Sequence, residues 1–250
     1  MKRVIIIQSR MTSTRLPGKI LMDVAGKPML AQQLRRLKQC RAVDQIVVAT
    51  TDNSADDPVV ELARKEGVGW FRGSEHDVLG RYVGAAREAK ADIVIRSTGD
   101  CPLIDARVTD AVIHELEIHA ATADYVCNFK PRTFPRGLDV EAFFSDVLWR
   151  VDRLAQTRSA REHVTLFIHA EHPELFWQRN IADNQDNSDL RWTVDEEVDL
   201  QLVRLIYDAL DLGSRAAPYE EILAYVRRRP ELAGLNAGVT TWEPPGRKQV

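Results

Sequence analysis

Apolar and polar positions alternate along this chain in a pattern that predicts strands followed by helices. The first apolar run, at residues 4–7, contains only Val and Ile, which is typical of a strand covered on both faces of a parallel sheet. Met29, Leu30, Leu34 and Leu37 then recur at helical spacing. Four such units of strand and helix precede residue 120. Their strands are expected at residues 4–7, 45–49, 68–71 and 92–96, and the first three helices at residues 29–40, 58–66 and 78–89.

The order of the elements changes in the second half of the chain, where Pro131, Pro135 and Gly137 bracket a loop. The whole pattern predicts an α/β fold with three layers, helix, sheet and helix, around a mostly parallel but mixed sheet. In the second half we expect strands at residues 124–128, 138–144, 175–181 and 190–194, and helices at residues 145–155, 196–210 and 218–229, with residues 161–165 near the start of a further helix.

No stretch has the composition of a linker, so we expect a single domain at residues 1–235 and a C-terminal tail at residues 236–250. Pro244, Pro245 and Gly246 lie among the last ten or so residues, which are expected to fray. Residues 125–190 are a candidate inserted arm for dimerisation or for binding of an acceptor.

Composition and charge restrict the class of protein. With 250 residues, 44 % hydrophobic residues and a formal net charge of −3, the chain is typical of globular proteins and lacks the excess of positive charge that favours nucleic acid as a partner. The apolar run at residues 4–7 is too short for a signal sequence or a membrane span, so we expect a cytoplasmic protein without membrane contact. Cys40, Cys101 and Cys127 are odd in number and widely spaced, which predicts reduced thiols.

The loop that follows the first strand is rich in cations and hydroxyl groups, and Pro17 and Gly18 stop it from continuing as a helix. Open α/β sheets place ligands at the carboxyl ends of their strands, so this composition predicts a cradle for several phosphate oxygens. A solvated basic loop with structural salt bridges is the alternative. The cations are Arg10, Arg15 and Lys19, and the hydroxyls belong to Ser9, Thr12, Ser13 and Thr14.

Asp100 and Asp195 each follow a predicted strand, so both are expected to project toward the side of the sheet that carries this loop. Carboxylate oxygens are ligands that Mg²⁺ prefers, and the ion bridges phosphates in many nucleotide sites. The pair therefore predicts a Mg²⁺ site. The alternative is local: Asp195 caps the helix that begins at residue 196, and Asp100 caps the turn before Pro102.

Several motifs spread over the chain resemble those of one enzyme family. They are IQSRMTSTRLPGK at residues 7–19, TGDCPL at residues 98–103, TFPRGLDVE at residues 133–141, REHVT at residues 161–165 and TVD at residues 193–195. The chain resembles the acylneuraminate cytidylyltransferases and, within them, the branch of the spore-coat polysaccharide biosynthesis proteins. The resemblance implies a nucleotidyltransferase fold related to the GT-A type, CTP as the donor, Mg²⁺ as the cofactor and a homodimer.

The basic loop departs from the family pattern at two positions, since Ser9 replaces an alanine and Thr12 replaces a glycine. A β-branched residue adopts positive φ poorly. We therefore expect either a slightly shifted loop or a role for the Thr12 hydroxyl as a ligand.

The motifs and the resemblance together suggest roles for the residues of the expected cleft. Nucleotidyl transfer builds charge on non-bridging phosphate oxygens, so positioning and cations carry most of the catalysis. The triphosphate is assigned to Arg10, Ser13, Arg15 and Lys19, catalysis to Arg10, Lys19, Asp100 and Asp195, and metal binding to Asp100 and Asp195. Recognition of the cytosine is assigned to Thr50, Asp52, Arg72 and Arg81, although Arg81 equally fits a solvated helix position.

The acceptor is expected to be an acidic sugar of the nonulosonate kind. Bidentate arginine suits its carboxylate, and a histidine with a near-neutral pKa can take the proton of the attacking hydroxyl. The alternative for residues 161–163 is an ion pair and a packed imidazole at a helix start. The residues assigned to the acceptor are Arg136, Asp139, Arg161 and His163.

The sequence thus predicts a Mg²⁺-dependent cytidylyltransferase that joins CMP to an acidic sugar and releases pyrophosphate, for a surface polysaccharide or another glycan. Two alternatives stay open. One is a glycosyltransferase that uses a nucleotide sugar, for which Asp139-Val140-Glu141 is the nearest metal-binding motif. The other is a nucleotide-binding protein without catalysis.

Overall fold

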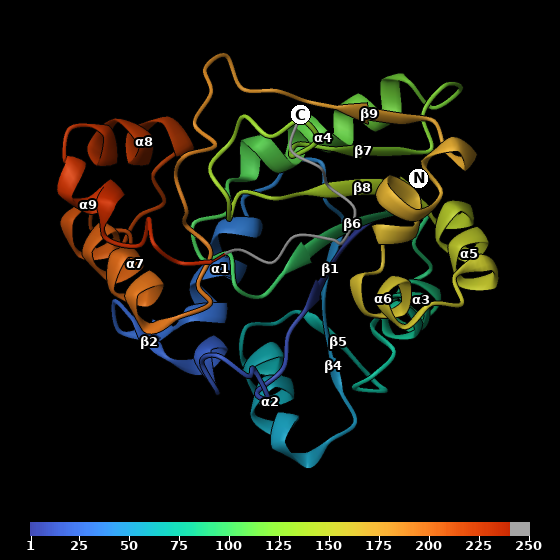
Figure 1. The fold of residues 1–250 in the computed structure, drawn as a ribbon. Coiled ribbons are helices and arrows are strands. Elements are labelled where there is room, and N and C mark those ends of the chain that lie inside the picture. The colour runs from blue at the N-terminus through green and yellow to red at the C-terminus, as the bar shows by residue number, and fades with distance from the viewer. Residues whose placement is uncertain (241–250) are drawn as a thin grey trace.

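Seven strands form one sheet in the computed structural model, which describes residues 1–240 (Figure 1). Across the sheet they follow in the order β5 (Gly69–Gly73), β4 (Gln45–Thr51), β1 (Arg3–Gln8), β6 (Ile93–Thr98), β8 (Glu141–Phe144), β7 (Tyr125–Cys127) and β9 (Gln178–Asn180). The first four run parallel, β8 is antiparallel to both of its neighbours, and β9 is parallel to β7. The predicted mostly parallel, mixed sheet is confirmed.

Helices cover both faces of this sheet, and Figure 1 shows α3, α5 and α6 together on one side of it. On β1, Ile5 and Ile7 are buried in one core while Val4 and Ile6 are buried in the other, which explains the continuous apolar run. The first core contains side chains of α1 (Met29–Leu37), α2 (Asp57–Lys65), α4 (Ala106–Ile118), α7 (Glu197–Ala209), α8 (Tyr219–Arg227) and α9 (Pro230–Gly234), and the second contains those of α3 (Val78–Ala89), α5 (Ser145–Leu154) and α6 (Arg158–His163).

Shorter elements complete the described chain. They are the two-stranded ribbon of β2 (Asp23–Val24) and β3 (Lys27–Pro28), the 3₁₀ turns η1 (Lys19–Leu21), η2 (Ser54–Asp56) and η4 (Pro173–Leu175), and the π-helical turn η3 (Phe167–Glu171). The three cysteines are free, as predicted. No helix within residues 1–240 is both long enough and apolar enough to span a bilayer.

Two expected elements are wrong. Residues 190–194 form no strand of the sheet, because their backbone forms an isolated bridge with Arg136 and one hydrogen bond with Asp100 instead of a ladder. Arg161 and His163 lie in the second half of α6 rather than at a helix start, since this helix is capped at Thr157 and ends before Val164, whose φ is 55°. The strands expected at residues 138–144 and 175–181 are shorter than predicted.

Residues 125–190 contribute β7, β8 and β9 to the main sheet, and their role in dimerisation stays a prediction. The folded part extends past residue 235, because Asn236 is buried and donates hydrogen bonds to Arg191 and Asp199. The residues expected to fray, at positions 241–250, lie outside the described part.

Candidate active site

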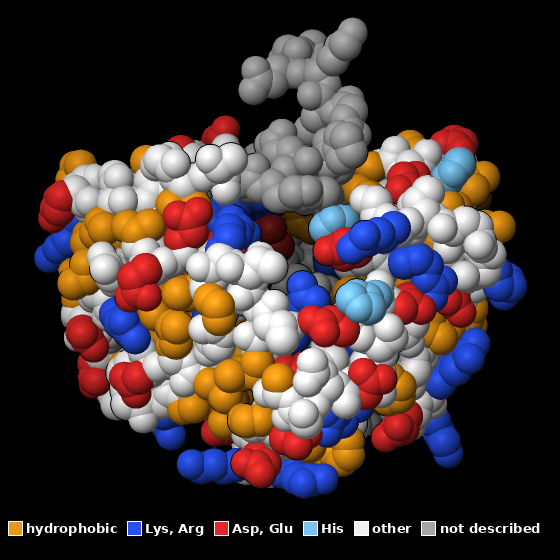
Figure 2. All heavy atoms as spheres, turned by 60° about the horizontal axis from the view of Figure 1, so that its bottom comes forward, with side chains coloured by type: hydrophobic (Ala, Val, Ile, Leu, Met, Phe, Trp, Pro, Cys, Tyr) orange, Lys and Arg blue, Asp and Glu red, His pale blue; other side chains and the backbone are white. Residues whose placement is uncertain are grey.

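A cleft of about 540 Å³ opens beyond the carboxyl ends of β1 and β6, beside α3 and α6. Figure 2 shows basic, acidic and histidine side chains around a hollow on one face of the molecule, in agreement with the mixed lining of this cleft. The structure brings together eight residues that the sequence predicted for the site, namely Arg10, Ser13, Arg15, Lys19, Arg81, Asp100, His163 and Asp195.

The loop between β1 and η1 is folded back on itself and anchored to the turn after β4. The amide of Gly18, whose φ of 72° favours a residue without Cβ, donates to the Met11 carbonyl oxygen at 2.9 Å. The Met11 amide donates to Oδ1 of the fully buried Asp56 at 2.6 Å. These bonds hold the basic side chains of the loop at the wall of the cleft.

Glu75 connects Thr12 and Arg10 from the other side of the cleft. Arg10 Nη1 and Thr12 Oγ1 both donate to Glu75 Oε1, at 3.2 Å and 2.5 Å. Thr12 is not among the described residues with positive φ, so the threonine at this position requires no left-handed backbone. In this structure its hydroxyl fixes the loop through Glu75, a residue that the sequence did not single out.

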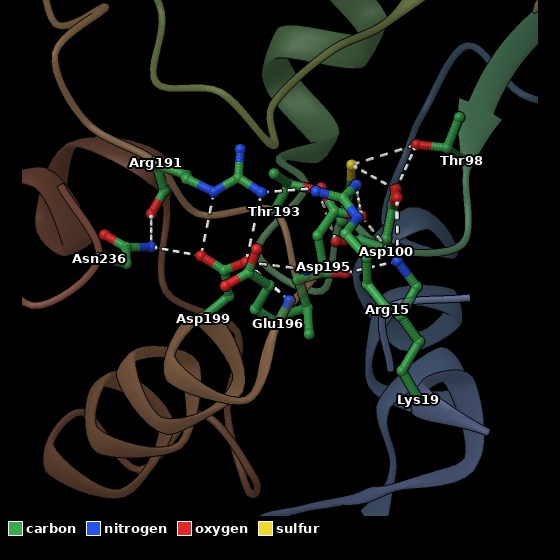
Figure 3. Close-up of polar contacts among 12 residues, drawn as sticks. Arg15, Lys19, Thr98, Asp100, Arg191, Thr193, Asp195, Glu196, Asp199 and Asn236 are labelled. Atoms are coloured by element: carbon green, nitrogen blue, oxygen red, sulfur yellow. Dashed lines mark hydrogen bonds and ion pairs between the residues drawn. The ribbon is translucent and has the colours of Figure 1, made fainter. Parts of the chain in front are cut away.

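Lys19 lies at the centre of the site, with its ammonium group among three oxygens (Figure 3). Its Nζ is 2.6 Å from the Val194 carbonyl oxygen, 3.0 Å from Asp195 Oδ1 and 3.4 Å from Asp100 Oδ2. Burial alone would lower the pKa of Lys19, but the two carboxylates outweigh it and raise that pKa. The lysine is therefore fully charged at neutral pH.

Asp100 and Asp195 meet because two distant segments pack closely. The Val194 amide and the Thr193 hydroxyl donate to the Asp100 carbonyl oxygen at 2.8 Å and 3.2 Å. Gly137 lets a third segment pack against Trp192 and Thr193, since its φ is 108° and a Cβ there would lie 2.5 Å from the Thr193 nitrogen. The predicted convergence of the two carboxylates on one side of the sheet is confirmed.

The capping role considered for Asp195 is not found. The N-cap of α7 is Glu196, which forms a capping box with Asp199. Asp195 instead pairs with Lys19, with Arg15 Nη2 at 2.9 Å and with Arg191 Nη2 at 2.7 Å. Burial would raise the pKa of Asp195, but Lys19, Arg15 and Arg191 lower it below its ordinary value. Its carboxylate therefore stays ionised at neutral pH.

Arg81 is a buried cation with unsatisfied donors. Its side chain lines the cleft although the residue is only 3 % exposed, and its Nε and Nη1 have no hydrogen-bond partner within the described chain. Burial lowers the pKa of its guanidinium, and the like charge of Arg10 lowers it further. The charges of Asp56 and Glu75 oppose this shift, but two donors of the buried guanidinium remain unpaired, which is costly, so Arg81 suits a negatively charged or carbonyl oxygen of a ligand.

The wall opposite the basic loop is formed by α6, which contributes Arg158, Glu162 and His163. Burial is the main cause that lowers the pKa of His163, and Arg96 adds to it while Glu162 opposes it. The imidazole is therefore neutral at pH 7. The sequence did not single out Arg158 and Glu162. A helix that begins after the Thr157 cap places them one turn apart, but the expected helix start was set too late to reveal this spacing.

Six predicted site residues do not line the cleft. Thr50 is fully buried in β4 and Asp52 is exposed beyond its end. Arg72 pairs with Asp57 and Asp139 pairs with Arg132. The backbone of Arg136 bonds to Leu190 and Trp192.

The sixth of these residues is Arg161. Its side chain connects α6 to α3 and α5. Its guanidinium contacts both carboxylate oxygens of Asp77, the N-cap of α3, and Oδ1 of Asp152 on α5. The alternative of a structural ion pair is therefore found for Arg161, although its partners are the N-cap of α3 and a residue of α5 and not residues at the start of its own helix.

The donor set fits a Mg²⁺ ion. Within residues 1–240 no group of three or more His, Cys, Asp or Glu side chains is arranged for a metal. Mg²⁺ does not need one, because it is commonly held by one or two carboxylates together with substrate phosphates. Asp100 Oδ2 and Asp195 Oδ1 both contact Lys19 Nζ, so the two carboxylates lie close enough to share one cation, which in this structure is the lysine.

Comparison with known proteins identifies the class to which this site belongs. Residues 4–200 match the family model of the cytidylyltransferases. The chain therefore belongs to the cytidylyltransferase family and is a nucleotidyltransferase, which confirms the resemblance seen in its motifs.

Individual relatives match nearly the whole chain. The spore coat polysaccharide biosynthesis protein SpsF of Bacillus subtilis (strain 168) is 30 % identical over 236 residues, which are 91 % of this chain and 95 % of SpsF. A cytidylyltransferase from Leptospira borgpetersenii serovar Hardjo-bovis (strain JB197) has a TM-score of 0.90 at 32 % identity and matches over 97 % of this chain and 100 % of its own. A CMP:2-keto-3-deoxy-manno-octonic acid synthetase complexed with CTP shares the fold, with a TM-score of 0.64 at 21 % identity over 84 % of this chain and 100 % of its own.

Proposed function

We propose that this protein transfers CMP from CTP to a hydroxyl of an acidic, nonulosonate-type sugar and releases pyrophosphate, as a step in the synthesis of a surface polysaccharide or glycan. The observation that carries the proposal is the position of Lys19. It joins the basic loop after β1 to the carboxylate pair of Asp100 and Asp195 in one cleft. Such a site has cations for a triphosphate and ligands for its metal side by side.

The reaction needs an attacking oxygen in line with the departing pyrophosphate, while negative charge shifts among the phosphate oxygens. Arg10, Arg15 and Lys19 would hold those oxygens by charge-assisted hydrogen bonds, and Ser13 would add a hydroxyl donor. Asp100 and Asp195 would hold Mg²⁺, which neutralises phosphate charge when it is bound. No covalent enzyme intermediate is required.

CTP as the donor is supported by the family and by the relative whose structure contains CTP. Of the four residues assigned to the base, only Arg81 lines the cleft, and its unpaired donors suit a base carbonyl or a phosphate oxygen. A competition assay tests the donor: CTP is expected to protect the protein against thermal unfolding and to support pyrophosphate release better than UTP, ATP or GTP. A preference for UTP would reject the cytidylyl assignment.

The residues that would bind the acceptor sugar lie on α6. Five Lys and Arg side chains line the cleft, and Arg10, Arg15 and Lys19 are paired with carboxylates. Arg81 is buried beside Arg10, whereas Arg158 is exposed and makes no ion pair with any carboxylate of residues 1–240. Arg158 would therefore bind the carboxylate of the acceptor, and the neutral His163 would accept the proton of its attacking hydroxyl.

Arg158→Ala is expected to raise the KM for the acidic sugar roughly 10–100-fold, because a hydrogen bond to a charged group contributes about 1.5–3 kcal/mol. The KM for CTP is expected to stay unchanged. Steady-state kinetics with each substrate varied in turn measure both values. Arg153→Ala, at an exposed arginine near the end of α5 outside the cleft, is the matched control. An equal rise in the KM for CTP would contradict the assignment.

The glycosyltransferase alternative loses its candidate motif in this structure. Asp139 pairs with Arg132, Glu141 pairs with Arg96, and neither residue lines the cleft. The homodimer and the cytoplasmic location implied by the resemblance are part of the same proposal, and analytical ultracentrifugation tests the former.

A further inference from the structure

Arg191 lies behind the site, between two carboxylates, and only 8 % of it is exposed (Figure 3). Its Nη2 donates to Asp195 Oδ2 at 2.7 Å and to Asp199 Oδ2 at 3.3 Å, while its Nε donates to Asp199 Oδ1 at 3.0 Å. Arg191 does not line the cleft. Its planar guanidinium thus fixes the orientation of Asp195 relative to Asp199 without reaching the space where a substrate would bind.

Asp199 is itself held rigidly. It is 1 % exposed, and its Oδ2 accepts the amides of Asp195 and Glu196 at 2.9 Å and 3.0 Å. From the C-terminal region, Asn236 Nδ2 donates to Asp199 Oδ1 at 2.7 Å and to the Arg191 carbonyl oxygen at 3.0 Å. Asp199 is therefore tied to the backbone at the start of α7 and to the side chain of Asn236 beyond α9.

The two oxygens of Asp195 have different surroundings. Oδ2 faces Arg191, while Oδ1 faces the cleft, where it is 3.0 Å from Lys19 Nζ and 2.9 Å from Arg15 Nη2. Within residues 1–240, rotation of the carboxylate without Arg191 would be opposed only by the two cations on the cleft side. Those cations must interact with phosphate during the proposed reaction, so they cannot also serve as the permanent support of Asp195.

We propose that Arg191 is a positioning residue for the proposed metal site: it retains Asp195 Oδ2 so that Oδ1 stays directed at the cation position shared with Asp100. The inference rests on the proposed function, which assigns Asp195 to Mg²⁺. Asp199 and Asn236 complete the support by holding Arg191 in place. Groups that orient a ligand in this way commonly affect metal affinity roughly 10–100-fold when they are replaced.

The test compares Arg191→Met with Arg191→Lys. Methionine removes the guanidinium and all of its hydrogen bonds. Lysine keeps a positive charge that can reach Asp195 but cannot bridge to Asp199 at the same time. The full-length protein is titrated with Mn²⁺ in the presence of CTP, and free Mn²⁺ is measured by electron paramagnetic resonance. The Mg²⁺ concentration for half-maximal pyrophosphate release is measured in parallel. Arg191→Met is expected to lower the affinity for Mn²⁺ and to raise the Mg²⁺ concentration for half-maximal release, each roughly 10–100-fold. Arg191→Lys is expected to recover part of both effects.

Arg227→Met is the matched control, because Arg227 also pairs with an aspartate and an asparagine, Asp189 and Asn187, but does not contact Asp195. It is expected to leave the Mn²⁺ affinity unchanged. If Arg191→Met fails to fold, Asn236→Ala replaces it, since this change removes one bond to Asp199 and is expected to weaken Mn²⁺ binding to a smaller extent.

Folded variants with lower thermal stability but wild-type Mn²⁺ affinity and Mg²⁺ requirement would overturn the proposal, because Arg191 would then be merely structural. Failure of the proposed function gives a different result. In that case the wild type releases no pyrophosphate from CTP with any acidic sugar, while the Mn²⁺ titration still reports whether Arg191 supports the cation position.

Discussion

Lys19→Met is expected to lower the rate of pyrophosphate release roughly 10²–10³-fold, the loss that follows removal of one preorganised donor to a transition-state oxygen. Lys19 is the cation that contacts both carboxylates, so it lies where the proposed function places the junction of triphosphate and metal. A coupled pyrophosphate assay at saturating CTP and acceptor measures the effect on kcat.

The matched control for this prediction is Lys38→Met, at a lysine that pairs with Glu66 outside the cleft. It is expected to keep the wild-type rate. Thermal unfolding checks that both variants fold. A folded Lys19→Met protein with wild-type kcat would remove Lys19 from the catalytic machinery.

Asp100→Asn is expected to have an effect of similar size, together with a higher Mg²⁺ requirement. Asparagine keeps the shape of the side chain but removes the negative charge that attracts the metal. The expected loss of rate is roughly 10²–10³-fold at low Mg²⁺, and a high Mg²⁺ concentration should recover part of it. Pyrophosphate release as a function of Mg²⁺ concentration measures both effects.

Asp146→Asn controls for the loss of one carboxylate, since Asp146 is exposed in the first turn of α5 and does not line the cleft. A slower Asp100→Asn variant with an unchanged Mg²⁺ requirement would mean that Asp100 acts through Lys19 alone and is not a metal ligand.

The first half of the fold was predictable because its elements are determined by local patterns. The run at residues 4–7 had to be a doubly covered strand, and the helix predicted at residues 78–89 forms as α3, capped by Asp77 through the amide of Gly80. Residues 190–194 alternate apolar residues with Arg191 and Thr193, a pattern that also fits a strand, yet no ladder forms there. Their partners, Arg136 and Asp100, lie on segments that only tertiary packing brings close.

In the candidate site, too, some positions followed from local sequence patterns and others depended on tertiary packing. Strand-end logic predicted that Lys19 and Asp100 lie together, because residues that follow parallel strands share one edge of the sheet. Asp195 joins them although the strand expected before it does not form, since the Val194 amide bonds to the Asp100 carbonyl oxygen. The sequence could not predict which arginines face a ligand in the cleft. Whether an arginine faces a ligand depends on which carboxylates are near it, and Arg161 finds Asp77 at a separation of 84 residues. Arg158 stays available because its neighbours do not neutralise it.

The central claim is that this cleft transfers CMP to an acidic sugar, and the most direct measurement is pyrophosphate release by the wild-type protein from CTP and Mg²⁺ with a panel of acceptors. The panel contains sialic, legionaminic, pseudaminic and 3-deoxy-octulosonic acids, with neutral sugars and sugar phosphates as controls. We predict release with at least one acid, matched by an equal amount of its CMP-sugar in mass spectrometry, and none with the controls. Tight binding of CTP without release for every acid, or equal release with neutral sugars, would contradict the account.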